Sequence, residues 1–180
     1  MRKKDLLLAA VLLLLTAIGL LLAFLPQSQG LSQAEKAAVL EISGQKASAL
    51  RDLTEEALAG RRDKYPEVKK VLAAGEDYAF ICCPWGYNGT IDLVVVISSA
   101  SQTIKGVRIL RHQESLEYVR DFASGWFVEP FFGKSSSTHF ELTRFGATLP
   151  EEVDIITGAT ITSQAVVNGV NAALEVYSTF

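Results

Sequence analysis

The sequence predicts an α+β fold in which one N-terminal transmembrane helix precedes a single domain with a mainly antiparallel sheet and a C-terminal helix. Three observations lead to it. An uncharged apolar run opens the chain, short β-branched runs separated by turn residues fill its middle, and a helical periodicity closes it. Strands followed by a terminal helix favour α+β over a parallel βαβ repeat.

The first segment is expected to cross a membrane. Residues 6–25 carry no charge, and about twenty residues at about 1.5 Å of rise each span a bilayer core. The tail 1–5 is basic, whereas 26–34 on the far side has no charge. The positive-inside rule therefore predicts a single-pass protein of the cytoplasmic (inner) membrane, with the N-terminus inside and the C-terminal domain extracytoplasmic, or periplasmic. A cleaved signal peptide is the alternative, but its apolar region usually has only about 7–15 residues.

Residues 26–66 are expected to form a linker and an amphipathic helical segment, and 67–180 the domain. The helical spacing between 34 and 62 comes from Ala38, Ile42, Ala49, Leu53 and Leu58. This segment either offers a packing surface to partner subunits or packs on its own domain, and the second interpretation is favoured. Without its basic start the domain is mildly acidic, which makes nucleic acid an unfavourable partner.

Short apolar runs after Pro66 predict the strands. They cover 78–81, 91–97, 104–110, 140–145 and 153–156. The run 91–97 is β-branched and nearly continuous, as in a strand that is buried on both faces, whereas 104–110 alternates. Residues 98–103 between them are expected to form a hairpin loop.

The C-terminal helix is predicted from apolar residues that share one face, while Asn168 and Glu175 point elsewhere. The apolar residues are Val166, Val170, Ala173, Leu174 and Tyr177. Thr162 or Ser163 is the predicted N-cap, so 157–163 is a turn that leads into a helix N-terminus. Such a turn suits a phosphate, because unpaired N–H groups and the positive end of the helix dipole point into it. Small and hydroxylated residues before a helix are, however, also ordinary capping.

The cysteines and histidines give weaker indications. Cys82 and Cys83 are adjacent, and neighbours in sequence rarely bridge each other. Two partly buried thiols at a strand end are therefore favoured over one unpaired or intermolecular thiol. His112 and His139 lie far apart without a Cys or His at ligand spacing, which argues against a metal site.

Residues 154–163, Asp-Ile-Ile-Thr-Gly-Ala-Thr-Ile-Thr-Ser, resemble the flavin-attachment motif of the FMN-binding domain family, an acidic residue followed shortly by Ser/Thr-Gly-Ala-Thr. They most resemble the flavin-bearing G subunit of the Rnf ion-translocating electron-transport complex, and are similar also to the C subunit of the sodium-pumping NADH:quinone reductase. The resemblance implies that Thr160 carries FMN as a phosphoester, which a separate flavin transferase donates from FAD. The other cofactor-binding residues would be Asp154, Thr157, Gly158, Ala159, Thr162, Ser163, His112 and Glu114.

The resemblance continues upstream in the family's order. Residues 86–91 (Gly-Tyr-Asn-Gly-Thr-Ile) resemble the entry to its first long strand, 106–114 the strand that ends in His-x-Glu, and 126–133 its short helix and aromatic-Gly segment. One departure follows Glu114, where the family has Thr-Pro-Gly-Leu-Gly and this chain has Ser-Leu-Glu-Tyr-Val at 115–119. Without proline or glycine this stretch can continue as helix instead of a tight loop.

The resemblance implies an electron carrier with no catalytic residue and no turnover of its own, anchored in lipid and working with other membrane subunits of an electron-transport complex. A stand-alone extracytoplasmic flavin carrier and a tethered scaffold domain without flavin are the alternatives. Three aromatic residues could stack on the flavin ring or belong to the core or rim: Trp85, Tyr87 and Trp126. Three cations could neutralise the phosphoester or be solvated: Arg108, Lys134 and Arg144.

Overall fold

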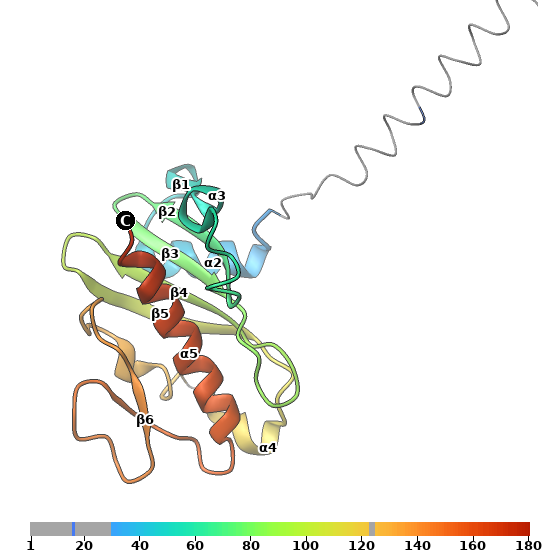
Figure 1. Cartoon of the computed structure of the whole chain (residues 1–180), viewed down its shortest axis with the longest axis vertical. Helices are drawn as coiled ribbons and strands as arrows, with labels where there is room; N and C mark the ends of the chain where they lie inside the picture. Colours follow the sequence, from blue (N-terminus) through green and yellow to red (C-terminus); the bar gives the residue numbers. More distant parts are fainter. Residues whose placement is uncertain (1–15, 17–29, 123–124) are drawn as a thin grey trace, which may run out of the picture. The chain divides into compact units, whose positions relative to one another are not determined.

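An antiparallel five-stranded sheet, whose strands lie side by side in chain order, forms the centre of the fold (Figure 1). Its strands are β1 (Leu50–Asp52), β2 (Val68–Ala74), β3 (Asp77–Cys82), β4 (Asp92–Ser98) and β5 (Thr103–Arg111). The computed structural model describes Thr16 and residues 30–122 and 125–180, of which 32–180 form one compact unit. The strands predicted at 78–81, 91–97 and 104–110, and the hairpin loop at 98–103, are confirmed with small changes at their ends.

The predicted transmembrane helix over 6–25 lies outside the described residues except for Thr16, and so does the basic tail 1–5. Among the helices that the structure does describe, none has the length and apolar character needed to cross a membrane.

One face of the sheet packs against the long helix α5 (Thr160–Tyr177), which crosses in front of the strands in Figure 1. Phe80 of β3 pairs with Val71 and Val95 of the neighbouring strands, and all three side chains are fully buried in this core. Asn168 and Glu175 of α5 are exposed. The predicted apolar face of the helix is confirmed, because each of its members is buried: Val166, Val170, Ala173, Leu174 and Tyr177.

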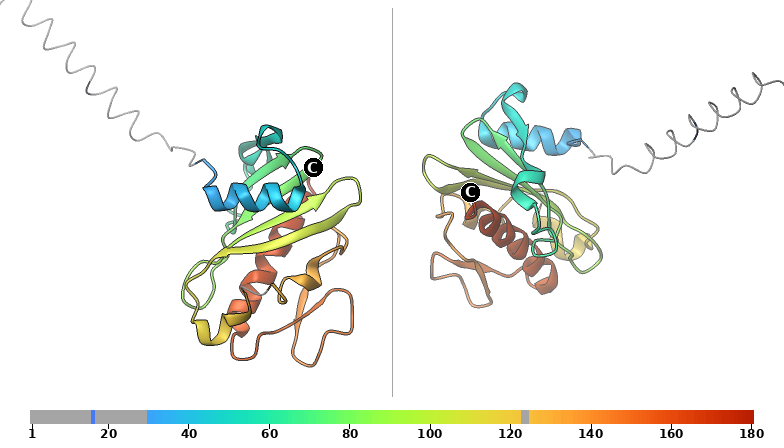
Figure 2. Two further views of the ribbon diagram at one scale, coloured as in Figure 1. Left: turned by 180° about the vertical axis from the view of Figure 1, so that it is seen from behind. Right: turned by 45° about the horizontal axis from the view of Figure 1, so that its top comes forward.

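Helix α2 (Gln33–Ser43) lies against the opposite face of the sheet, as the left view of Figure 2 shows. Small residues on this face let the helix approach closely. Ala79 of β3 and Gly106 of β5 both pair with Val96 of β4. A Cβ atom at Gly106 would lie 2.8 Å from Cγ2 of Ile42, so a larger residue at this position would require Ile42 to shift. The interpretation that this amphipathic helix packs on its own domain is therefore confirmed.

The segment between α2 and β3 is less regular than its helical pattern indicates. It contains a 3₁₀ turn η1 (Ala47–Ala49), the edge strand β1 and a short helix α3 (Thr54–Leu58). Strand β2 is not among the predicted strands, because Lys69 and Lys70 interrupt its apolar pattern. Tertiary pairing with β3 along most of its length fixes it as a strand nevertheless.

A separate two-stranded sheet joins β6 (Glu141–Thr143) to β7 (Glu152–Asp154), which run parallel. Strand β6 falls inside the predicted range 140–145, and β7 overlaps the predicted range 153–156, but both are shorter. Asn171 attaches this sheet to α5, because its Oδ1 accepts the N–H of Phe140 and its Nδ2 donates to the carbonyl of Phe140, each at 2.9 Å. The remaining elements are α4 (Leu116–Val119), η2 (Arg120–Phe122) and η3 (Glu129–Phe131).

Candidate functional site

A glycine turn brings Thr160 to the first position of α5. Gly158 has a φ of +81°, in the left-handed region that glycine adopts without strain, and the N–H of Ala159 donates to the carbonyl of Ile156 at 2.9 Å. Ala159 is the N-cap, and among the described residues no side chain caps this end of the helix. The Thr160 side chain is exposed there, next to N–H groups that have no partner inside the helix.

The predicted N-cap at Thr162 or Ser163 is wrong, because α5 begins at Thr160. The two hydroxyls are buried and engaged elsewhere. Thr162 donates its hydroxyl to Glu114, and Oγ of Ser163 accepts the N–H of Ile156 at 3.0 Å. They therefore hold the turn against the domain and do not cap the helix.

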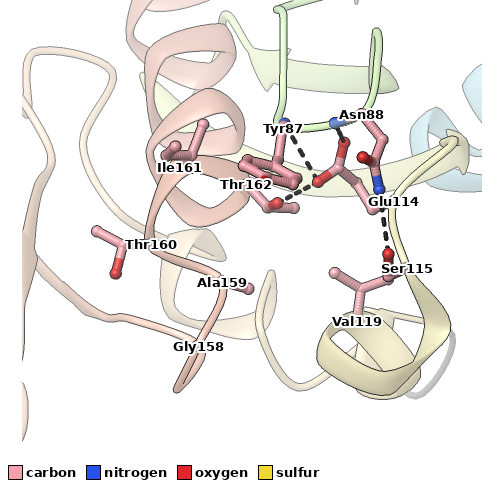
Figure 3. Close-up of a pocket in the computed structure, with 10 residues that line it drawn as sticks. All are labelled: Tyr87, Asn88, Glu114, Ser115, Val119, Gly158, Ala159, Thr160, Ile161 and Thr162. Atoms are coloured by element: carbon pink, nitrogen blue, oxygen red, sulfur yellow. Dashed lines mark hydrogen bonds between the residues drawn. The ribbon is translucent and has the colours of Figure 1, made fainter.

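Glu114, which follows β5, ties three segments together beside this turn (Figure 3). Its carboxyl group is nearly buried, with 6% of the residue exposed. Oε1 accepts the N–H of Asn88 at 2.8 Å, and Oε2 accepts the N–H of Tyr87 at 3.2 Å and the hydroxyl of Thr162. The end of β5, the loop between β3 and β4, and the first turn of α5 thus meet at one side chain.

Glycine at position 86 makes this meeting possible. Its N–H donates to the carbonyl of Gly89 at 2.7 Å, which closes the loop on itself. A Cβ atom on Gly86 would lie 2.7 Å from Oε1 of Glu114, so any larger residue would displace the carboxylate. A further bond, from Nδ2 of Asn88 to Oγ of Ser115 at 3.1 Å, joins the loop to the start of α4.

A cavity of about 380 Å³ opens between these segments. Small-molecule sites are commonly about 300–1,000 Å³. Helix α4 (Leu116–Val119) forms one wall through Val119, so of the two conformations considered for residues 115–119 the chain adopts the helix, with Ser115 as its N-cap. The lining residues are Tyr87, Asn88, Glu114, Ser115, Val119, Gly158, Ala159, Thr160, Ile161 and Thr162.

The model of the FMN-binding domain matches residues 86–175, half of the chain and all of the cavity lining. The chain belongs to the FMN-binding domain family. The membership expected from the attachment motif is thereby confirmed.

Curated relatives agree with this membership. The G subunit of the Na⁺-translocating ferredoxin:NAD⁺ oxidoreductase complex of Acetobacterium woodii is 38% identical over 95 residues, which cover 51% of this chain and 44% of the relative. The G subunit of the ion-translocating oxidoreductase complex of Salmonella typhi is 32% identical over 134 residues, which cover 71% and 58%. The chain therefore spans about half the length of the curated relatives it matches.

Solved structures of the C subunits of Na⁺-translocating NADH-quinone reductases are similar as well. The protein from Parabacteroides distasonis is 22% identical with a TM-score of 0.49, over 62% of this chain and 60% of that one. NqrC from Shewanella oneidensis is 17% identical with a TM-score of 0.45, over 58% of each chain.

Two features of this site would suit the binding of a flavin nucleotide. The uncapped start of α5 offers N–H donors and the positive end of an 18-residue helix to a phosphate, with the exposed Thr160 hydroxyl beside them. The cavity offers apolar walls at Val119 and Ile161 to a ring system. Figure 3 shows the Thr160 side chain on the side of α5 that faces away from Glu114, so the carboxylate does not point at the hydroxyl.

The structure brings five of the predicted site residues to the cavity lining: Glu114, Gly158, Ala159, Thr160 and Thr162. Four others lie outside the lining. Asp154 is half-buried at the end of β7, Thr157 is exposed in the turn, and Ser163 is fully buried beneath it. His112 packs edge-on against Phe122, with 5.4 Å between the ring centres.

Five lining residues were not among the predicted site residues, and one of them, Tyr87, was expected only as an aromatic that could stack on the flavin ring. The other four are Asn88, Ser115, Val119 and Ile161. Asn88 had a local signal, because it stands between glycines in a turn before a strand. Val119 had none, since only the helical geometry of α4 turns it toward the cavity.

Of the aromatic and cationic residues that the sequence suggested for flavin or phosphate contact, one lines the cavity and the others do not. Tyr87 lines the cavity and is 70% exposed, whereas Trp85 and Trp126 are not part of the lining. Arg108 is bound on the α2 side, where Glu41 accepts from both of its terminal nitrogens at 2.6 and 2.7 Å and this hydrogen bonding raises the pKa of the guanidinium. Lys134 and Arg144 do not line the cavity either.

The two cysteines lie away from the site. Cys82 is buried and Cys83 half-buried at the end of β3, which confirms the favoured interpretation of two partly buried thiols. Burial raises the pKa of both thiols, that of Cys83 to about 12, with a hydrogen bond to Asp92 contributing. In the part of the chain that the structure describes, no group of three or more His, Cys, Asp and Glu side chains is placed to hold a metal ion.

Proposed function

We propose that this chain is a membrane-anchored flavoprotein that carries FMN as a phosphoester on Thr160 and relays electrons within an Rnf-type ion-translocating complex. The observation that carries the proposal is the exposed Thr160 hydroxyl at the uncapped start of α5, beside a cavity inside the FMN-binding match. The names of the relatives, which are G subunits of ion-translocating complexes, support the role in electron transport.

The attachment step exchanges the phosphoanhydride bond of FAD for a phosphoester bond to Thr160. Oγ of Thr160 forms a bond to the FMN phosphorus of FAD while the pyrophosphate bond breaks, so AMP leaves and the hydroxyl proton passes to a base of a separate flavin transferase. The exposure of Thr160 and Gly158 supports access by such an enzyme. The dipole of α5 would then stabilise the phosphate charge.

The isoalloxazine supplies the reversible redox chemistry once it is bound. The chain would hold it through apolar contacts with Val119 and Ile161, a ring contact with Tyr87, and hydrogen bonds from Asn88 and Ser115, all of which line the cavity. The expected single span with an extracytoplasmic domain places this flavin outside the cytoplasm, where covalent attachment prevents its loss.

Covalent loading tests the proposal directly. The chain is co-expressed with a flavin transferase, separated on a denaturing gel and examined for ultraviolet fluorescence. We expect a fluorescent band and an intact-mass increase that matches an FMN phosphoester, both abolished in Thr160→Ala. Thr157→Ala is the matched control, because Thr157 is an exposed hydroxyl of the same turn, and it should load normally. A dark wild-type band, or loss of loading in Thr157→Ala alone, would contradict the assignment.

A second candidate is a stand-alone extracytoplasmic flavin carrier. The wall formed by α4, where the family has a Pro-Gly loop, favours it, because a different wall suits a different exchange partner. Purification in mild detergent separates the two functions. Co-purification of further membrane subunits supports the complex, a fluorescent chain without them supports the stand-alone carrier, and a chain without flavin leaves only the tethered scaffold domain.

A further inference from the structure

Glu114 presents a buried carboxylate to the cavity, and within the described residues no cation is bonded to it. Its hydrogen-bond donors there are the N–H groups of Tyr87 and Asn88 and the hydroxyl of Thr162, all of them neutral. Both carboxyl oxygens accept hydrogen bonds, as the oxygens of a carboxylate do. The ion pairs found among the described residues lie elsewhere: four join residues of α2 and the strands β2 to β5, and one joins Glu55 of α3 to Arg62.

The hydrogen bonds of this side chain do not by themselves require a charge. A glutamine at position 114 would accept the N–H of Asn88 through its carbonyl oxygen, and its amide would donate to the hydroxyl of Thr162, which can accept as well as donate. The bond from the N–H of Tyr87, the longest at 3.2 Å, would be replaced by two N–H donors that face each other. A substitution at position 114 can therefore remove the negative charge while the side chain still joins the three segments.

We propose that Glu114 lowers the redox potential of FMN bound in this cavity, an inference that rests on the proposed function. Reduction adds electrons to the flavin, and a nearby negative charge opposes this addition. The opposition is stronger in a partly desolvated cavity than in water, because the effective dielectric constant is lower. Charge close to the flavin ring is one of the means by which a protein adjusts the cofactor.

Two variants separate charge from structure. Glu114→Gln removes the charge and keeps most of the hydrogen bonds, whereas Thr162→Val keeps the charge and removes one neutral donor. The chain is loaded with FMN in full length, loading is verified by fluorescence and intact mass, and the midpoint potential of the loaded fraction is measured by spectroelectrochemistry. We expect the potential to rise in Glu114→Gln, and to fall or stay in Thr162→Val, because a carboxylate with fewer donors is a stronger negative field.

The outcomes distinguish this inference from the proposed function. Absence of FMN from the wild-type chain overturns the proposed function and the inference with it. Normal loading with an unchanged potential in Glu114→Gln overturns the inference alone, and so does a rise of equal size in both variants, since loosening of the cavity would move both in one direction. If Glu114→Gln acquires no FMN, Thr162→Val decides: a rise overturns the inference, and a fall or no change supports it.

Discussion

The clamp between Asn171 and Phe140 yields a quantitative prediction. Asn171 is buried, with 8% of the residue exposed, and it satisfies both the N–H and the carbonyl of Phe140. A buried polar group left without a partner costs about 1–3 kcal/mol. Asn171→Leu keeps a similar volume but leaves two such groups, so we expect the free energy of unfolding to fall by about 3–5 kcal/mol. Asn171→Ala should cost about 2 kcal/mol, because water can reach the groups from the adjoining cavity of about 480 Å³.

Urea unfolding of the full chain in mild detergent, followed by circular dichroism, measures these differences. Asn168→Leu is the matched control, since Asn168 lies on the exposed side of α5 and bonds only to Gln164 among the described side chains. It should change the free energy of unfolding by less than about 0.5 kcal/mol. Equal losses in Asn171→Leu and Asn168→Leu would refute the reasoning, because the clamp would then contribute nothing beyond a surface residue.

Two further predictions concern other contacts. Gly106→Ala should destabilise the domain by about 1–3 kcal/mol, because the new methyl group clashes with Ile42. In the double variant, Ile42→Ala should recover part of that loss, which thermal unfolding can measure. Additive losses from the two substitutions would contradict the contact. The raised pKa of Cys83, about 12, keeps its thiol protonated at pH 8, so alkylation counted by intact mass should be slow in the native chain. Because the pKa of Cys83 is higher in the folded than in the unfolded chain, its contribution to the free energy of unfolding is fully present below the unfolded pKa and is lost as the pH rises toward 12. Fast alkylation of the native chain at pH 8 would contradict the raised pKa.

The central strands could be predicted because their own residues specify them. The run at β4 is apolar and β-branched almost throughout, and the spacing along α5 places its apolar residues on one face. Strand β2 could not, because Lys69 and Lys70 lie within it and its pairing with β3 decides the outcome. The parallel pairing of β6 with β7 likewise joins segments whose sequences do not indicate their relative direction.

At the site, too, the features that depend on neighbouring residues could be predicted, and those that depend on residues far away in the chain could not. The turn at Gly158 could be predicted from neighbouring residues, whereas the family resemblance directed attention to Thr160. The start of α5 was not, because the hydroxyls of Thr162 and Ser163 look like caps until their distant or buried partners are known. The resemblance drew attention to Glu114, but its donors stand 26 to 48 positions away in the chain.

The contact between Glu114 and Thr162 bears on the order in which the protein folds. The sheet joins strands that are neighbours in sequence, and contacts of that kind close short loops and form quickly. The bond between Glu114 and Thr162 closes a loop of 48 positions, so the flavin cavity is expected to assemble after the strands. A transferase that recognises the assembled turn would then modify only chains that have completed folding, and covalent flavin would serve as a mark of a finished domain.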